Sequence, residues 1–81
     1  MSYYLFYNGK AVSYFYPNGN GQVNDIIGFS GRSFEIFNSK EEAEERVEYF
    51  KRAIRERDDF DLKLSIKLFN IFDKIKVKER K

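Results

Sequence analysis

The sequence predicts a small α+β domain in which one long helix packs on one face of an antiparallel sheet. Three observations lead to this prediction: an Asn-Gly hairpin signal near the start, a helix-capping sequence at Ser39, and alternating apolar residues near the end. The 81 residues are too few for two ordinary domains, so we expect a single domain over 1–81.

The first element is a hairpin. Residues 2–7 and 10–16 are rich in Tyr, Phe, Leu and Val, as strands are, and Asn8-Gly9 between them suits a tight two-residue turn. The first strand is apolar on both faces, with Tyr3, Leu5 and Tyr7 on one and Tyr4 and Phe6 on the other. One face should pack on the core, while the other is either covered or presents its rings.

A long helix follows a less regular stretch. Residues 17–21 favour a loop, residues 23–29 fit either a helical turn or a strand, and residues 33–37 predict a strand. The glycines at 19, 21, 28 and 31 are interpreted as turn formers. Ser39 and Glu42 form a capping-box pattern, and apolar residues then recur at helical spacing, which predicts a helix over about 39–57.

The last third of the chain is compatible with two structures. Apolar and polar residues alternate over 62–68 and again over 74–78, which predicts a second hairpin and the order β-β-β-α-β-β. Six apolar residues also fall within one third of a helical wheel, namely Phe60, Leu64, Leu68, Ile71, Phe72 and Ile75. A helical C-terminal segment is therefore the alternative, and we expect it to reduce the sheet to three strands.

Composition argues against catalysis. The chain has no Cys and no His, which excludes disulfides, thiolate metal sites and the usual general base near neutral pH. The one carboxylate cluster, Asp58, Asp59 and Asp61, lacks the further oxygen ligands and the glycine of a calcium loop. We therefore predict a protein that is not an enzyme and has no cofactor and no metal.

Hydrophobic stretches long enough for a membrane span or a secretory signal are missing from the sequence. We therefore expect no membrane partner and a cytoplasmic location.

Charge is distributed unevenly. The net charge is +2, yet residues 62–81 carry seven basic and two acidic side chains. Such a basic segment attracts phosphate groups or acidic partners. Rings on an exposed sheet face can in addition stack with nucleobases. We predict phosphate contacts from Lys74, Lys76, Lys78 and Arg80, and stacking by Phe34 or by tyrosines of the hairpin such as Tyr16.

The segment Gly28-Phe29-Ser30-Gly31 and the following Phe34, Phe37, Ser39 and Glu42-Ala43 resemble the caulimovirus viroplasmin family. That family includes the N-terminal hybrid-binding domain of eukaryotic-type ribonuclease H. The resemblance implies a small antiparallel sheet with helical cover that binds duplex RNA or RNA–DNA hybrids through aromatic and basic residues. Phe34 would occupy the position of the stacking aromatic. Tyr16 would lie nearest the expected Trp, and Lys10 would remain from the basic turn.

The favoured functional hypothesis is a small nucleic-acid-binding module that acts on RNA or hybrids. Its candidate site comprises Lys10, Tyr16, Phe34, Lys74, Lys76, Lys78 and Arg80. The alternative is a protein-interaction module, either a homodimer or an accessory protein of a virus or plasmid that binds a host protein, because apolar residues on both strand faces must be covered.

Overall fold

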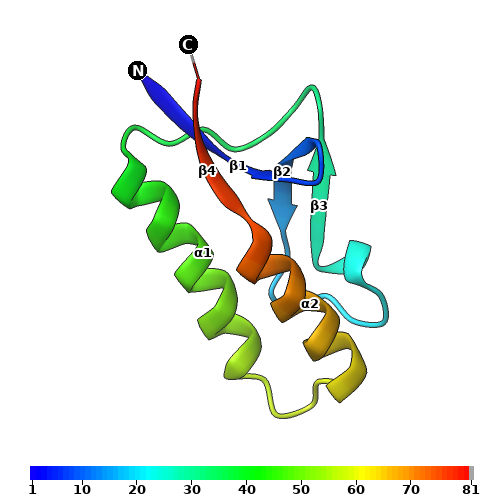
Figure 1. Ribbon diagram of the computed structural model, residues 1–81. Helices are drawn as coiled ribbons and strands as arrows, with labels where there is room; N and C mark the ends of the chain where they lie inside the picture. Colours follow the sequence, from blue (N-terminus) through cyan, green and yellow to red (C-terminus); the bar gives the residue numbers. More distant parts are fainter. Residues whose placement is uncertain (81) are drawn as a thin grey trace.

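A computed structural model, which describes residues 1–80, shows a four-stranded antiparallel sheet and two α-helices in the order β-β-β-α-α-β (Figure 1). The α+β class and the antiparallel sheet are as the sequence predicts. The elements are β1 (Ser2–Tyr7), β2 (Lys10–Phe15), the short 3₁₀ turn η1 (Val23–Asp25), β3 (Ile27–Ser30), α1 (Lys40–Arg55), α2 (Leu62–Lys74) and β4 (Lys76–Arg80).

The strands lie in the order β3-β2-β1-β4. The first three strands form a meander, and β4 returns after both helices to pair with β1 from Ser2↔Arg80 to Phe6↔Lys76. Ser2, near the start of the chain, and Arg80 therefore lie side by side (Figure 1). This pairing brings the basic end of the sequence onto the edge of the sheet.

The predicted hairpin is confirmed. Asn8 and Gly9 both have positive φ, 50° and 84°, as a tight turn whose twist matches its flanking strands requires. The β1–β2 ladder contains the pairs Phe6↔Ala11 and Tyr7↔Lys10.

Farther from the turn, residues 34–37 form backbone hydrogen bonds with both β1 and β2. The Glu35 N–H donates to the Val12 carbonyl at 3.2 Å, while Phe37 and Tyr3 exchange backbone hydrogen bonds of 2.8 and 2.9 Å. The strand expected over 33–37 is therefore an extended segment with a single bridge at Phe37. Its alternation still matters, because Phe37 is buried in the core and Ile36 is 45% exposed.

The ambiguous stretch 23–29 contains both of the structures considered for it, since η1 is followed directly by β3. The interpretation of Gly28 as a turn former is wrong, because Gly28 lies inside β3. A Cβ atom built there would lie 1.9 Å from the ring of Tyr14, its partner on β2. The Tyr14 ring therefore packs directly against the backbone of Gly28, which leaves no space for a side chain there.

The long helix is confirmed as α1. Ser39 is its N-cap and its side chain accepts a hydrogen bond from the Glu42 N–H at 3.1 Å. Ala43, Phe50 and Ile54 bury one side of the helix, and Arg52 and Arg55 lie in its last turn, where the helix dipole favours positive charge.

The strand preferred over residues 62–68 is wrong, because this segment is the first part of α2. The helical alternative holds for Leu62–Lys74, yet the sheet keeps four strands because β4 follows immediately. Asp61 caps the helix by accepting a hydrogen bond from the Lys63 N–H at 3.0 Å. Leu64 and Leu68 are buried, whereas Leu62 and Ile66 are 73% and 54% exposed. A strand would have placed all four side chains on one face, whereas the helix buries only Leu64 and Leu68.

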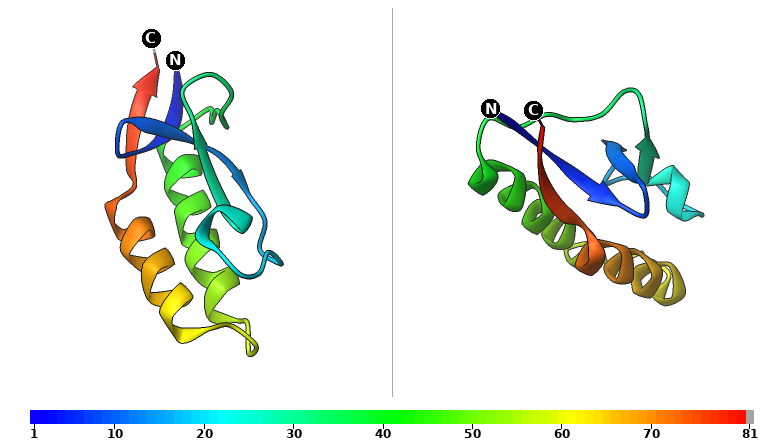
Figure 2. Two further views of the ribbon diagram at one scale, coloured as in Figure 1. Left: turned by 90° about the vertical axis from the view of Figure 1, so that its right-hand side faces the viewer. Right: turned by 45° about the horizontal axis from the view of Figure 1, so that its top comes forward.

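Both helices cover the same face of the sheet (Figure 2). Phe15 from β2, Phe50 from α1 and Phe72 from α2 meet in the core, with ring centroids 4.3 to 6.3 Å apart. In residues 1–80 no helix lies on the opposite face of the sheet.

Arg57, in the connection between the helices, holds the loop that follows β2. Its guanidinium donates hydrogen bonds to the carbonyls of Pro17 and Gly19, and its side chain is only 14% exposed. It also contacts the exposed carboxylate of Asp59 at 3.3 Å. The hydrogen bond from Arg57, and secondarily its charge, lower the pKa of Asp59.

Arg57→Ala should destabilise the fold by about 1–3 kcal/mol in urea unfolding, because two loop carbonyls lose a charged donor. Asp59→Asn, which leaves those two bonds in place, is the control and should change stability little. Asp59 should titrate below its ordinary range in the native protein and return toward that range in Arg57→Ala, as measured by NMR. Because the Asp59 carboxylate is exposed, the pair makes only a small contribution to stability above the ordinary pKa of an aspartate, and this contribution is lost as the pH falls through the lowered pKa of Asp59. Equal stability of both variants would show that Arg57 does not hold the loop.

Gly28→Ala should cost about 1–3 kcal/mol, because the added methyl group collides with the Tyr14 ring. Gly31→Ala is the matched control, since a Cβ atom at Gly31 meets no atom within 4 Å. Thermal unfolding of the two variants beside the parent protein checks this, and a Gly28 variant as stable as the Gly31 variant would contradict it.

Candidate nucleic-acid interface

The sheet face opposite the helices carries a patch of aromatic and basic side chains. Along β1 the odd residues face the helices, as buried Leu5 shows, so Tyr4 and Phe6 point to the other side. Their partners on β4 are Lys78 and Lys76, which lie directly opposite and therefore on the same face. We define the open-face patch as Tyr4, Phe6, Phe34, Lys76, Lys78 and Arg80.

The rings of the patch contact one another. The Tyr4 centroid lies 5.2 Å from that of Phe34 and 6.4 Å from that of Phe6. All three side chains are only partly buried, so part of each remains accessible to solvent.

Cations from β4 lie over these rings. The Lys78 Nζ atom is 3.8 Å from the Phe6 centroid, and the Arg80 guanidinium carbon is 6.0 Å from the Phe34 centroid. Both contacts are within the range of cation–π attraction. Positive charge therefore lies beside the aromatic rings of the patch.

The structure brings together four of the seven predicted site residues, namely Phe34, Lys76, Lys78 and Arg80. Lys74 ends α2 and, with Lys76, lines a small hollow beside Phe6, Tyr7 and Asn8. Tyr16 is 59% exposed and stacks on Tyr14 at 4.8 Å, with no ring contact to the patch. Tyr4 is one of the hairpin tyrosines for which stacking was predicted. Phe6 was not predicted, although the two-faced apolar pattern of β1 was the signal for it.

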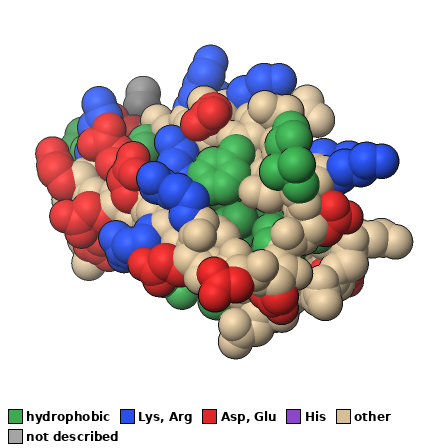
Figure 3. Space-filling view, turned by 90° about the horizontal axis from the view of Figure 1, so that it is seen from below, with side chains coloured by type: hydrophobic (Ala, Val, Ile, Leu, Met, Phe, Trp, Pro, Cys, Tyr) green, Lys and Arg blue, Asp and Glu red, His purple; other side chains and the backbone are tan. Residues whose placement is uncertain are grey.

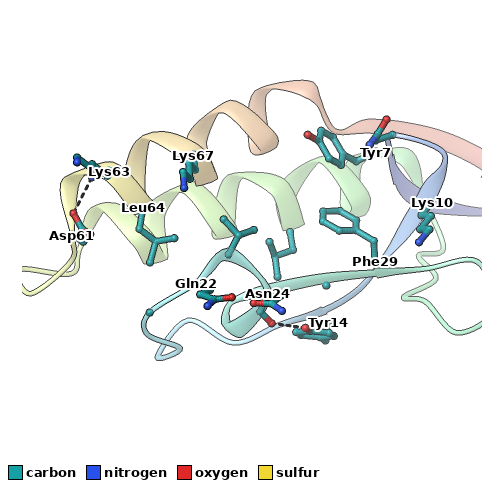
Figure 4. Close-up of a pocket in the computed structure, with 15 residues that line it drawn as sticks. Tyr7, Lys10, Tyr14, Gln22, Asn24, Phe29, Asp61, Lys63, Leu64 and Lys67 are labelled. Atoms are coloured by element: carbon teal, nitrogen blue, oxygen red, sulfur yellow. Dashed lines mark hydrogen bonds between the residues drawn. The ribbon is translucent and has the colours of Figure 1, made fainter.

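Lys10 lies apart from the patch, in a groove of about 950 Å³ between α2 and the β3 side of the sheet. Lys63 and Lys67 of α2 line one wall, with Gln22 and Asn24 from the η1 region opposite (Figure 4). Tyr7 and Phe29 lie together at the end near Lys10, with their ring centroids 5.2 Å apart. Three lysines and one aspartate, Asp61, are the charged residues of its lining.

Hydrophobic side chains are also exposed away from the sheet. Leu62 and Ile66 lie one helical turn apart on the outer side of α2. The view from below shows hydrophobic side chains surrounded by charged ones (Figure 3). Leu62 and Ile66 are thus a second exposed apolar feature, apart from the open-face patch.

The aspartate cluster is accounted for by local structure. Asp59 pairs with Arg57, and Asp61 caps α2. Within the part of the chain that the structure describes, no three His, Cys, Asp or Glu side chains are grouped so that they could hold a metal ion. No helix of residues 1–80 is both long and apolar enough to cross a membrane.

Comparison with known proteins adds no relative: no family model, no curated protein and no solved structure matches the chain.

Proposed function

We propose that this protein is a small, non-enzymatic nucleic-acid-binding module that uses the open-face patch. The observation that carries the proposal is the pairing of β1 with β4, which sets Tyr4 and Phe6 directly opposite Lys78 and Lys76 on an uncovered sheet face. Rings for stacking and cations for phosphate contact then occupy one surface, and this combination recurs in proteins that bind nucleic acids.

Each part of the patch has a separate task. Lys76, Lys78 and Arg80 contact phosphates, which contributes affinity that depends on salt and little on sequence. Tyr4 and Phe34 offer ring faces to unpaired bases, which contributes affinity that depends less on salt. The position of Phe34 on the patch supports the stacking role implied by the viroplasmin resemblance, although Tyr16 and Lys10 lie elsewhere.

The phosphate contacts predict a steep dependence of binding on salt. Lys78→Gln/Arg80→Gln protein should bind a labelled 12-nucleotide RNA more weakly, with the slope of log K against log salt reduced by about 0.7 for each lost contact. Fluorescence anisotropy at several salt concentrations measures this slope. Lys40→Gln/Arg55→Gln, which removes two exposed cations of α1, is the charge-matched control and should keep the parent slope. Equal slopes for both double variants would contradict a role for the patch.

The stacking contacts predict a loss that salt does not remove. Tyr4→Leu or Phe34→Leu should weaken binding to single-stranded RNA by about 1–3 kcal/mol, which is roughly 5- to 150-fold, at every salt concentration. Tyr16→Leu is the control because this exposed ring contacts Tyr14 and not the patch. If Tyr16→Leu costs as much as Phe34→Leu, the assignment of the patch fails.

The second candidate function is a protein-interaction module, as a homodimer or with another protein. Exposed Leu62 and Ile66 on α2 favour it, because paired apolar side chains at a helix surface suit a protein contact. Charged residues along the edge strand β4 argue against dimerisation by strand addition. Light scattering separates the two functions: a tight dimer that loses RNA binding when formed would favour this alternative.

A further inference from the structure

The lysine-lined groove beside α2 is not isolated from the open-face patch. Tyr7 and Asn8, at the β1–β2 turn, line both this groove and the small hollow that contains Phe6, Lys74 and Lys76. Phe6 and Lys76 are in turn members of the patch. A continuous surface therefore leads from the sheet face, around the hairpin turn, to the space between α2 and β3.

Lysines follow this surface along α2. Lys63, Lys67 and Lys74 recur at intervals of four and seven residues, which places them on one side of a helix. Lys63 to Lys74 spans about 16 Å at the rise of an α-helix. Across the groove, Lys10 supplies a further cation near the rings of Tyr7 and Phe29.

Acidic groups do not cancel this charge. Asp61, at the far end of the groove, has one carboxylate oxygen bonded to the Lys63 N–H as the helix cap. Asp73 borders the hollow near Lys74 and pairs with Lys51 of α1 at 3.2 Å. The groove therefore presents excess positive charge together with amide groups and three rings, those of Tyr7, Tyr14 and Phe29.

We infer that the ligand is a single strand of nucleic acid that crosses the open-face patch, bends around the β1–β2 turn and continues into the lysine groove. This inference rests on the proposed function and extends it by adding the lysine groove to the path of the bound strand. A duplex does not fit the path, because it stays straight over distances far greater than the 18–22 Å thickness of this domain. Its bases are also paired and stacked, whereas an unpaired strand can bend and can place bases on Tyr4, Phe34 or Tyr7.

The test compares single-stranded RNAs of different lengths. Single-stranded RNAs of about 4, 8 and 12 nucleotides, which sample the usual site sizes of small single-strand binders, are titrated into the parent protein and into Lys63→Gln/Lys67→Gln. Both lysines are exposed, so the variant should keep the fold, which circular dichroism checks. The variant should bind the shortest RNA as the parent does but the longest on the order of tenfold more weakly at 0.1 M salt, with a salt slope lower by about 1.4.

Lys40→Gln/Arg55→Gln again serves as the charge-matched control and should bind all lengths normally. Amide NMR shifts of Lys63 and Lys67 should respond to the longest RNA and not to the shortest. The inference is overturned if the groove variant binds the longest RNA as tightly as the parent, or if a 12-base-pair duplex binds as tightly as the single strand. In those cases the open-face patch still stands if Lys78→Gln/Arg80→Gln weakens binding. If the parent protein binds no nucleic acid, both the proposed function and this inference fail.

Discussion

The packing of Phe15, Phe50 and Phe72 determines how the rest of the molecule is arranged. These rings come from β2, α1 and α2, and they place both helices on a single face of the sheet. Aliphatic side chains, among them Leu5, Ile54 and Leu68, complete the same buried cluster. Because the aromatic core uses one face, the aromatic residues on the opposite side of β1 stay partly exposed. The open-face patch is thus a consequence of where the core lies.

The position of Phe34 in the open-face patch depends on the extended segment 34–37. Its backbone bonds to Tyr3 and Val12 insert it beside β1 and β2, and its alternation sends Phe37 inward. Phe34 therefore contacts Tyr4 on the outer face. Glu35, on the inner side, pairs with Arg46 of α1 at 3.4 Å and ties the segment to the helix layer. A short segment with a single bridge can in this way hold a ring of the candidate site in place.

Local signals were sufficient where a structure depends on adjacent backbone groups and insufficient where distant contacts decide it. Asn8-Gly9 fixes the turn and Ser39 fixes the start of α1, because each acts through adjacent backbone groups. The alternation after Asp61 favoured a strand over the helical alternative, but contacts with Phe15 and Phe50, distant in sequence, favour the helix. The patch could be foreseen in part, since Lys78 and Arg80 were predicted from charge. Their pairing with β1, and hence the roles of Tyr4 and Phe6, required the fold.

The helical state of residues 62–74 has consequences for the surface as well as for the core. In a strand, Lys63 and Lys67 would lie along one wet face and Leu62 and Ile66 along the buried one. As a helix, the same residues form three sides: Leu64, Leu68 and Phe72 toward the core, the lysines toward β3, and Leu62 and Ile66 toward solvent. The helical periodicity of this segment therefore explains both the exposure of Leu62 and Ile66 and the lysine groove. The choice that buries Phe72 in the aromatic core also gives α2 a basic wall facing the sheet.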